Sequence, residues 1–456
     1  MKPLMKTIID NKNELSITPL RAQALDIIEA GIFNVVPSTV MKHTVKFDPS
    51  SKILSILNKD FDVSRGRIFV TGGGKASGLM AQTLEEIIGP ENITGGYVNC
   101  IDKNYKTSKI EITRASHPTP DLAGVSGVKQ MLGLKDQYSI NEKDLVICLI
   151  SGGGSALMPC PVEGISLADK QRINDLLIVG GPTIQEINAV RKHLSRIKGG
   201  RMGKFFSPAR VVSLIISDVV GNNLDVIASG PTAPDPTTFS DALDVLTKYN
   251  LLAGTPESIV AYLGKGRAGK YEETPKELHN CHNFIIGDNR SALEAMVSKA
   301  IEFGFNPYIV TAEQKGDPTE MAKHRAAEIL NGKYNDHDVI LVGGETTPTL
   351  PRTHGKGGRN QQYATVSMIA LENYPGEWVM ASVGTDGSDF LPGIAGAIVD
   401  KNTLNAARLK EIEIQPYLER YDSNTLLERI GNSLVTTGNT GTNVGDVAIY
   451  IFPGYH

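Results

Sequence analysis

The sequence is poor in several residue types and patterns that point to particular classes of protein. It has four cysteines in 456 residues and no CxxC pair, which excludes a disulfide framework. Its longest apolar runs are of strand length, far below the roughly 20 residues of a membrane helix, and it opens without a signal sequence. A formal net charge of −4 excludes the broad positive field that nucleic acid or an anionic membrane attracts. We therefore expect a cytoplasmic protein with small-molecule ligands.

The length and the order of periodic segments predict two α/β domains. A chain of 456 residues exceeds the size at which a single hydrophobic core usually stops growing. Segment 264–275 is short of apolar residues and rich in glycine and charge, which is typical of a linker. We place the boundary there, with an N-terminal domain at 1–275 and a C-terminal domain at 276–456.

Apolar periodicity predicts the individual elements. Strands are expected at 67–71, 145–150, 210–216, 284–286, 308–311, 338–342, 378–383, 397–399 and 448–452, and helices at 19–36, 77–88, 291–303 and 319–330. Two more helices should begin at capping boxes, one opened by Ser166 with Asp169 and one by Thr183 with Glu186.

Three of these strands run directly into glycine-rich turns. The turns are Gly72-Gly73-Gly74-Lys75, Ser151-Gly152-Gly153-Gly154-Ser155 and Gly343-Gly344-Glu345-Thr346-Thr347. Glycine lets backbone N–H groups close on an anion, and the carboxyl ends of parallel strands open into the ligand crevice of α/β proteins. Three such turns predict a cleft that handles phosphate.

Two known phosphate-binding templates fail on this sequence. A dinucleotide-binding GxGxxG that starts at Gly72 would need glycine at position 77, where Ser77 stands, so a Rossmann dehydrogenase is disfavoured. A near match to a Walker A loop ends at Lys270, but Tyr271 replaces the hydroxyl that binds Mg²⁺, and the preceding segment is helical in pattern. We interpret the second match as misleading.

Two charged residues at strand ends are candidates for phosphoryl transfer. Lys75 follows three glycines, where an ammonium could reach a transferring phosphoryl group, although a solvated turn lysine is the plainer interpretation. Asp218 follows an almost wholly apolar strand and could accept a hydroxyl proton or hold Mg²⁺, or it could simply cap a turn.

Further candidates lie in a basic segment and in the C-terminal half. Six basic groups fall within eleven residues, namely Arg191, Lys192, His193, Arg196, Lys198 and Arg201. Such a run usually forms a solvated face, but in an acidic protein it equally suits anion binding. Arg359 follows two glycines and suits bidentate contact with phosphate or carboxylate, and Asp386 lies just after a predicted strand.

The motifs taken together resemble the class II glycerate kinases, also called the MOFRL family of glycerate 2-kinases. The resemblance is carried by Gly73-Gly74-Lys75-Ala76-Ser77, His117-Pro118-Thr119-Pro120-Asp121, the segments 151–156, 183–201 and 217–219, Gly287-Asp288-Asn289-Arg290, the segments 343–347 and 357–361, Gly384-Thr385-Asp386-Gly387, and Thr440-Gly441-Thr442-Asn443. These motifs occur in order along nearly the whole chain.

The resemblance implies a fold and a reaction. It implies an N-terminal domain with Rossmann-like α/β/α layers, a smaller C-terminal MOFRL-type α/β domain, and an active-site cleft between them. The implied reaction is the phosphorylation of D-glycerate to 2-phosphoglycerate by ATP with Mg²⁺ or another divalent cation. Small molecules are then the expected partners, and self-association into a homo-oligomer stays open.

The positions that match the family motifs define the expected site. Lys75, Asp218 and Arg359 look like the catalytic set, and Asp218 and Asp386 are the expected metal ligands. The expected substrate and phosphate contacts are Gly73, Gly74, Ser151, Gly152, Gly153, Ser155, Arg191, Lys198, Glu345, Asn439, Thr442 and Asn443.

The C-terminal half departs from the family pattern at several positions. The departures are Gln362 in place of glutamate, Phe390 and Gly393 within the stretch after Asp386, and Asn439 and Gly445 in place of proline and asparagine. Two other functions therefore stay open at this point. One is an NAD(P)H-dependent hydroxypyruvate reductase, and the other is a non-catalytic protein that binds small anions on the kinase scaffold.

Overall fold

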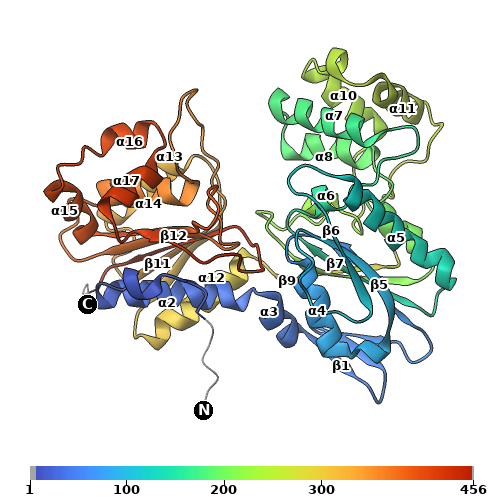
Figure 1. Cartoon of the computed structure of the whole chain (residues 1–456), viewed down its shortest axis with the longest axis horizontal. Helices are drawn as coiled ribbons and strands as arrows, with labels where there is room; N and C mark the ends of the chain where they lie inside the picture. The colour runs from blue at the N-terminus through green and yellow to red at the C-terminus, as the bar shows by residue number, and fades with distance from the viewer. Residues whose placement is uncertain (1–6, 454–456) are drawn as a thin grey trace. The chain divides into compact units, whose positions relative to one another are not determined.

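The computed structural model describes residues 7–453 and divides the chain into two compact units (Figure 1). One unit, which we call the split unit, combines residues 1–36 with residues 287–456, and the other, the inserted unit, is the continuous segment 37–286. The boundary expected after residue 275 falls before the last strand of the inserted unit, and the expected N-terminal domain included the helices before residue 37. The two-domain α/β fold class is confirmed.

The inserted unit contains nine strands and nine α-helices among the described residues. Its strands are β1 (Val45–Asp48), β2 (Ile53–Ile56), β3 (Lys59–Asp62), β4 (Ile68–Gly73), β5 (Ile93–Cys100), β6 (Ile110–Arg114), β7 (Leu145–Ser151), β8 (Arg210–Ile216) and β9 (Cys281–Gly287). Its helices are α3 (Pro37–Thr44), α4 (Ser77–Ile88), α5 (Leu122–Tyr138), α6 (Gly154–Leu157), α7 (Leu167–Gly180), α8 (Ile184–His193), α9 (Arg201–Phe206), α10 (Phe239–Lys248) and α11 (Glu257–Arg267).

A six-stranded sheet forms the centre of the inserted unit, in the order β6-β5-β4-β7-β8-β9. Its strands from β6 to β8 pair in parallel, as the predicted βα pattern requires. In β7, Val146, Cys148 and Ile150 pack in one cluster with α5 and α9, while the alternating Ile147 and Leu149 are also buried. Both faces of this sheet are therefore covered, which is why β7 is apolar throughout.

Helices α7, α8, α10 and α11 form a separate layer with a core of its own, seen at the upper right of Figure 1. Ile173, Leu177, Val190, Phe239 and Leu246 belong to that core. Both predicted capping boxes are present at the starts of α7 and α8. The expected linker at 264–275 is corrected in its first part, because residues 264–267 form the last turn of α11.

The split unit contains six strands and eight α-helices among the described residues. Its strands are β10 (Pro307–Gln314), β11 (Val339–Gly344), β12 (Val379–Gly384), β13 (Gly396–Asp400), β14 (Leu434–Val435) and β15 (Asp446–Ile451). Its helices are α1 (Lys12–Leu15), α2 (Pro19–Asn34), α12 (Asn289–Glu302), α13 (Pro318–Leu330), α14 (Arg359–Ala370), α15 (Lys401–Leu409), α16 (Gln415–Glu419) and α17 (Ser423–Ile430).

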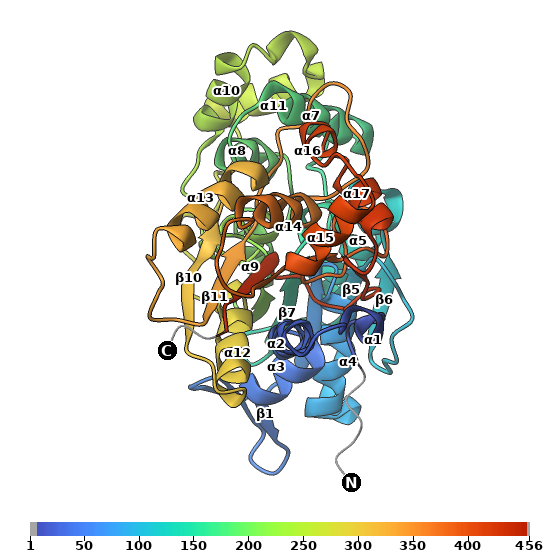
Figure 2. The ribbon, with the colours of Figure 1, turned by 90° about the vertical axis from the view of Figure 1, so that its left-hand side faces the viewer.

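The sheet of the split unit has the order β10-β11-β15-β12-β13-β14, and only β10 and β11 run parallel. Helices α13, α14, α15 and α17 pack on one face in a large apolar cluster with Trp378 and Tyr450. Helices α2 and α12 lie side by side against the sheet (Figure 2). Two N-terminal helices, α1 and α2, thus belong to a domain whose other elements all follow residue 286.

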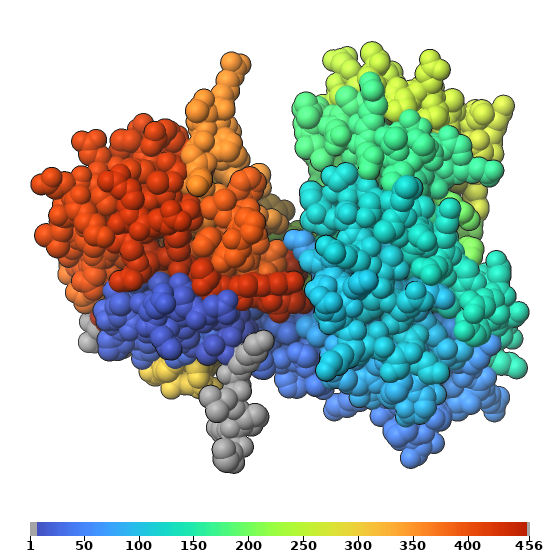
Figure 3. Space-filling model, in the orientation of Figure 1, coloured from blue at the N-terminus to red at the C-terminus, as the bar shows by residue number. Residues whose placement is uncertain are grey.

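Helix α2 is fixed to this sheet by apolar burial and by one buried cation. Its Ile27, Ile28 and Ile32 are fully buried. The guanidinium of Arg21 donates to the carbonyl oxygen of Ile398 at 3.3 Å, and it forms an ion pair with Asp400 at 3.6 Å. Figure 3 shows the blue N-terminal segment in contact with the red C-terminal segment. The start of the chain is therefore part of the C-terminal core.

Within residues 7–453, no single helix has the length and apolar composition to cross a membrane, and only α2 and α3 counted together reach both.

The close approach of α2 to α12 predicts that position 31 tolerates no side chain. A Cβ atom on Gly31 would lie 2.6 Å from Cγ of Met296 and 3.0 Å from the carbonyl oxygen of Ala292. We expect Gly31→Leu to lower the free energy of unfolding by about 2 kcal/mol, measured by urea denaturation.

The matched control is Gly133→Leu in the exposed part of α5, where an added Cβ meets nothing within 4 Å. Because leucine favours a helix over glycine, this variant should be as stable as the wild type or more stable by up to about 1 kcal/mol. Equal effects of the two substitutions would contradict the packing described for α2.

Candidate active site

Lys75 and Asp218 lie at the same edge of the inserted unit's sheet, on the two sides of β7. Gly73 of β4 pairs with Ile150 of β7, and Ser151 of β7 pairs with Ile216 of β8. Lys75 lies two positions after Gly73, and Asp218 lies two positions after Ile216. Since the three strands are parallel, their carboxyl ends bring an ammonium and a carboxylate to one edge, as the sequence predicted.

Some residues expected to contact phosphate shape the turn after β4. A Cβ on Gly74 would lie 2.1 Å from Oγ of Ser151, and one on Gly73 would lie 2.6 Å from Cγ of Met158. The Ser151 side chain is fully buried, and its Oγ accepts a hydrogen bond from the backbone N–H of Ala76 at 3.0 Å. Gly73, Gly74 and Ser151 therefore hold two neighbouring strand ends in contact.

The turn after β7 lies beside the lysine. The carbonyl oxygen of Gly152 accepts a hydrogen bond from the backbone N–H of Lys75 at 2.8 Å. Gly153 has φ of +78°, and a Cβ there would lie 2.9 Å from the His117 ring and 3.3 Å from Cγ of Lys75. Two of the three predicted glycine turns thus meet, whereas the third follows β11 in the split unit. Glycine at 153 leaves room between the lysine and the histidine.

The basic segment after position 190 is largely buried and is not a solvated face. Lys192 forms ion pairs with Asp225 and Asp235, at 2.9 and 3.2 Å. His193 Nε2 lies 3.0 Å from a carboxylate oxygen of Glu273. Both residues have carboxylate partners within the chain, which indicates a structural role.

Arg191 and Lys198, the two residues of this segment expected to bind substrate, differ from their neighbours. Nε of Arg191 donates to Oδ1 of Asn174 at 2.8 Å. Nζ of Lys198 donates to the carbonyl oxygen and to Oγ of Ser155, at 2.6 and 2.8 Å. Burial lowers the pKa of both cations. The hydrogen bonds from Lys198 link Ser155 to the basic segment. The hydroxyl of Ser155 also lies 2.9 Å from that of Ser229.

In the split unit, Arg359 begins α14 and is held by two carboxylates. Its Nε and Nη2 donate to the two oxygens of Asp446 at 2.6 and 3.0 Å, and its Nη1 lies 2.9 Å from Oε1 of Glu345. Burial lowers the pKa of Arg359, but Asp446 and Glu345 together raise it above its usual value. The guanidinium is therefore fixed in direction, with 28% of its side chain exposed.

Asp389 anchors the same helix end from inside the domain. One of its oxygens accepts hydrogen bonds from N and Nδ2 of Asn360, at 3.0 and 3.2 Å, and the other accepts from N and Nε2 of Gln361, both at 2.9 Å. Burial raises the pKa of Asp389 to about 6, while these four donors favour its charged form. Asn360 also donates to Asp446 at 3.0 Å, so the two carboxylates form one network.

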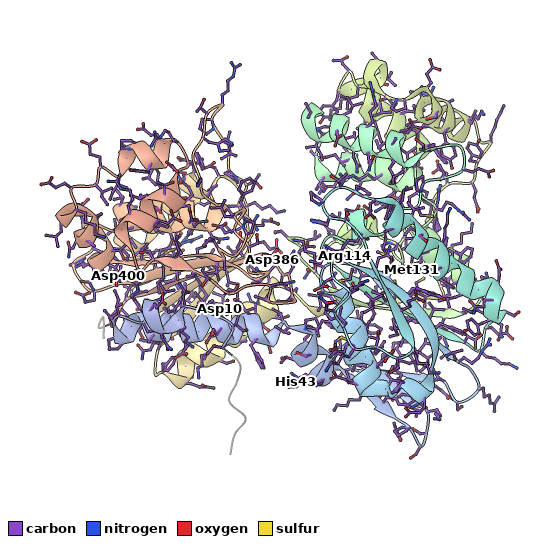
Figure 4. All side chains as sticks on the ribbon, viewed as in Figure 1. Asp10, His43, Arg114, Met131, Asp386 and Asp400 are labelled. Atoms are coloured by element: carbon purple, nitrogen blue, oxygen red, sulfur yellow. The ribbon has the colours of Figure 1, made fainter. Side chains whose placement is uncertain are left out.

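Asp386 lies beyond the carboxyl end of β12, while Asp400 marks the opposite end of the sheet (Figure 4). A Cβ on Gly384 would lie 3.5 Å from Oδ1 of Asp386 and equally far from Oδ1 of Asp446. Within residues 7–453, no three His, Cys, Asp or Glu side chains form a metal-binding group. The expected metal ligands Asp218 and Asp386 belong to different units.

The remaining expected contacts near the C-terminus have mixed roles. Thr442 is buried, and its Oγ1 donates to the carbonyl oxygen of Val35 at 2.6 Å, so it secures the end of α2. Asn439 is exposed, and its Oδ1 accepts from the N–H of Gly441 at 2.9 Å. Oδ1 of Asn443 accepts from the N–H of Gly445 at 3.2 Å. Only Asn439 and Asn443 thus keep side-chain surface.

The departures from the family pattern fall into two structural classes. Gln362 is buried, and its Nε2 donates to Oγ1 of Thr319 and to the carbonyl oxygen of Leu418. Phe390 is 78% exposed with φ of +66°. Phe390 lines a cavity of about 150 Å³ that Arg359, Leu350 and His354 also line. The first departure is absorbed by the core, and the second alters the surface beside Arg359.

Sequence reasoning missed three residues that the structure places in or beside these groups. Asp446 begins the last strand, and its position ahead of an apolar run could have indicated a strand-end carboxylate. His117 begins one of the family motifs, but the sequence did not predict that its ring lies beside Gly153. Lys170 lies just after a predicted capping box, yet its side chain is only 2% exposed. No local pattern distinguishes a buried lysine from a solvated one.

Two family models match the chain, one in each half. The model described as domain of unknown function DUF4147 matches residues 23–264, and the model of the MOFRL family matches residues 338–446. The first match spans more than half of the chain.

Named relatives cover nearly the full length. The glycerate 2-kinase of Pyrococcus horikoshii is 37% identical over 438 residues, which are 95% of this chain and 97% of the relative. The D-glycerate 2-kinase of Thermotoga maritima is 37% identical over 436 residues, covering 94% and 98%. The crystal structure of a Thermotoga maritima glycerate kinase matches with a TM-score of 0.82 at 36% identity, covering 94% of this chain and 98% of that one.

One group of relatives carries a different name. A putative hydroxypyruvate reductase of Agrobacterium vitis is 36% identical over 401 residues, covering 86% of this chain and 89% of the relative. Its coverage and identity are slightly lower than those of the two kinases.

The hydrogen bonds of Asp389 predict that this carboxylate is essential for stability. In Asp389→Asn, one acceptor oxygen becomes an NH₂ group that faces existing N–H donors, so buried donors lose their partner. We expect the free energy of unfolding to fall by roughly 2–4 kcal/mol in urea denaturation. The control Asp336→Asn, at an exposed position of the same unit, should change stability by less than about 0.5 kcal/mol. A stable Asp389→Asn protein would refute the anchoring role.

Proposed function

The chain belongs to the class II glycerate kinases, the MOFRL family, and from this premise we propose that it phosphorylates D-glycerate to 2-phosphoglycerate with ATP. The similarity of both halves to glycerate 2-kinases over nearly the whole chain carries this proposal. In the reaction, the 2-hydroxyl oxygen forms a bond to the γ-phosphorus, and the bond from that phosphorus to the β–γ bridging oxygen breaks. The substrates are small molecules, and the location we propose for the reaction is the cytoplasm.

We assign the hydroxyl acceptor chemistry to the sheet edge of the inserted unit. Asp218 takes or orients the proton of the 2-hydroxyl, and Lys75 neutralises charge that develops on the phosphoryl group. Their positions on the two sides of β7 support these roles. Gly152 and Gly153 carry no side chain, so we expect phosphate oxygens to approach the backbone N–H groups of this turn.

We assign a second neutralising charge to Arg359 of the split unit. Its two carboxylate partners hold the guanidinium in one orientation before substrate binds, so no ordering is needed during the reaction. Glu345, Asn439 and Asn443 follow as contacts from the same strand-end region. Lys75 and Asp218, in contrast, belong to the inserted unit.

The described carboxylates suit Mg²⁺ that arrives with the nucleotide. Mg²⁺ is usually held by one or two carboxylates together with phosphate oxygens and waters, so a cage of three protein ligands is not required. Asp218 and Asp386 are the residues we assign to it. When bound, the ion supplies charge neutralisation across the phosphates.

The reductase alternative has less support. The chain lacks the third glycine of a dinucleotide-binding turn, since Ser77 is buried within α4 at that position. The non-catalytic alternative rests on the departures from the family motif. The buried one, Gln362, directs its Nε2 to Thr319 and Leu418 and not to Arg359.

The decisive experiment is incubation with D-glycerate, ATP and Mg²⁺, followed by ³¹P NMR of the product. We expect 2-phosphoglycerate in equal amount to ADP. Sole formation of 3-phosphoglycerate would overturn the regiochemistry. Absence of ATP turnover, together with oxidation of NAD(P)H by hydroxypyruvate, would establish the reductase instead.

Lys75→Ala should abolish most turnover while the protein stays folded. Loss of one charge contact in the transition state costs on the order of 3 kcal/mol, about a hundredfold in kcat. The matched control is Lys270→Ala, an exposed lysine after α11, which should leave kcat and both KM values unchanged. Activity of the Lys75 variant within threefold of the wild type would remove this residue from the mechanism.

Asp218→Asn should lower kcat by at least about a hundredfold, because it removes basicity and charge with little change in shape. A titration with Mg²⁺ then separates the two roles of the carboxylate. Partial recovery at high Mg²⁺ indicates metal ligation, and no recovery indicates proton acceptance. Undiminished kcat would exclude both.

A further inference from the structure

Among its described residues, the inserted unit contains two buried lysines and one partly buried arginine that no carboxylate neutralises. They are Lys170 of α7, Arg191 of α8 and Lys198 in the loop that follows α8. The side chains of Lys170 and Lys198 are 2% and 1% exposed. None of the three forms an ion pair within residues 7–453, and Nζ of Lys170 has no hydrogen-bond partner there either.

A neighbouring lysine shows how this fold treats a buried cation that serves structure. Lys192 lies next to Arg191 in α8 and is 1% exposed, but its Nζ lies within 3.2 Å of carboxylate oxygens of Asp225 and Asp235. Asp235 is itself fully buried. Lys192 is therefore buried with two carboxylates as counter-charges, whereas Lys170 is buried with none.

The unmatched cations also repel one another. Burial first, and then the charge of Arg191, lowers the pKa of Lys170 to about 8. Burial and the charges of Lys170 and Arg191 lower the pKa of Lys198 well below its usual value. A buried ammonium without a counter-charge costs several kcal/mol of desolvation, so an anion that enters such a place is bound strongly.

The position of this group connects it to the proposed reaction. Lys198 donates to the carbonyl oxygen and hydroxyl of Ser155, which lies two residues after Gly153. An added Cβ at Gly153 would lie 3.3 Å from Cγ of Lys75. Lys198 thus contacts the segment that follows β7, which Lys75 also borders.

Resting on the proposed function, we propose that Lys170, together with Arg191 and Lys198, binds the carboxylate of D-glycerate. Glycerate has one charged group and almost no apolar surface, so charge recognition must supply most of its binding. ATP, in contrast, can also be bound through its base and ribose. A planar guanidinium beside two ammonium groups suits the two oxygens of a carboxylate.

The test substitution is Lys170→Met, which keeps the length of the side chain and removes its charge. We expect KM for D-glycerate to rise at least 20-fold, with KM for ATP changed less than twofold and kcat less than threefold. A KM for D-glycerate that stays within twofold would overturn the inference. A rise in KM for ATP alone would overturn it as well, because the anion would then be a nucleotide phosphate.

Stability provides a readout that does not depend on turnover. Lys170→Met removes an unpaired buried charge, so its thermal unfolding midpoint without ligand should equal or exceed that of the wild type. The matched control Lys192→Met leaves Asp235 without its partner and should lower the midpoint by several degrees. If both variants lose stability alike, Lys170 is a structural residue and the inference fails; Lys170→Gln repeats the test with a polar side chain.

Thermal shift with D-glycerate alone, without ATP, separates this inference from the proposed function. We expect D-glycerate to raise the midpoint of the wild type and not that of Lys170→Met. Stabilisation of the wild type without formation of phosphoglycerate would refute the kinase function and leave the anion site standing. Formation of 2-phosphoglycerate by a wild type and a Lys170→Met variant with equal KM for D-glycerate would do the reverse.

Discussion

The rest of the structure depends on the packing of helix α2 against the sheet of the split unit. That sheet is buried on both faces, and α2 with α12 supplies the cover on one of them. The buried Arg21 and the absence of a side chain at Gly31 fix how closely α2 approaches. The chain must therefore build one domain from its two ends, and residues 37–286 form a second compact unit between them.

Two sets of cations, one in each unit, differ in their partners. In the split unit, Arg359 is matched by Asp446 and Glu345 and is thereby oriented. In the inserted unit, Lys170, Arg191 and Lys198 have no matching carboxylate in the described chain. A matched cation directs its remaining N–H groups, whereas unmatched cations attract an anion. This difference underlies the two roles that we propose, positioning for Arg359 and anion binding for the three unmatched cations.

Several motif residues of the family have contacts that shape the fold around the site. Gly73, Gly74 and Ser151 allow the ends of β4 and β7 to touch, and Thr442 secures the end of α2. Their effect on catalysis is indirect, since they set where Lys75 lies. Substitution there should change folding and activity together. Lys75, Asp218 and Arg359 differ in this respect, because their side chains are only partly buried.

The sequence alone determined the α/β class, most of the long elements and the family. It also determined the strand ends that carry Lys75 and Asp218. Apolar periodicity and glycine turns are local patterns, so they can be read without the tertiary structure. Helix α4 begins and ends where its period predicted, at Ser77 and Ile88. Only the tertiary structure decided that α2 belongs to the C-terminal sheet, that Asp446 orients Arg359, and that Lys170 is buried without a partner. These three features depend on contacts between residues far apart in the chain. No local pattern encodes whether a charged side chain faces solvent, a carboxylate or an unmatched cation.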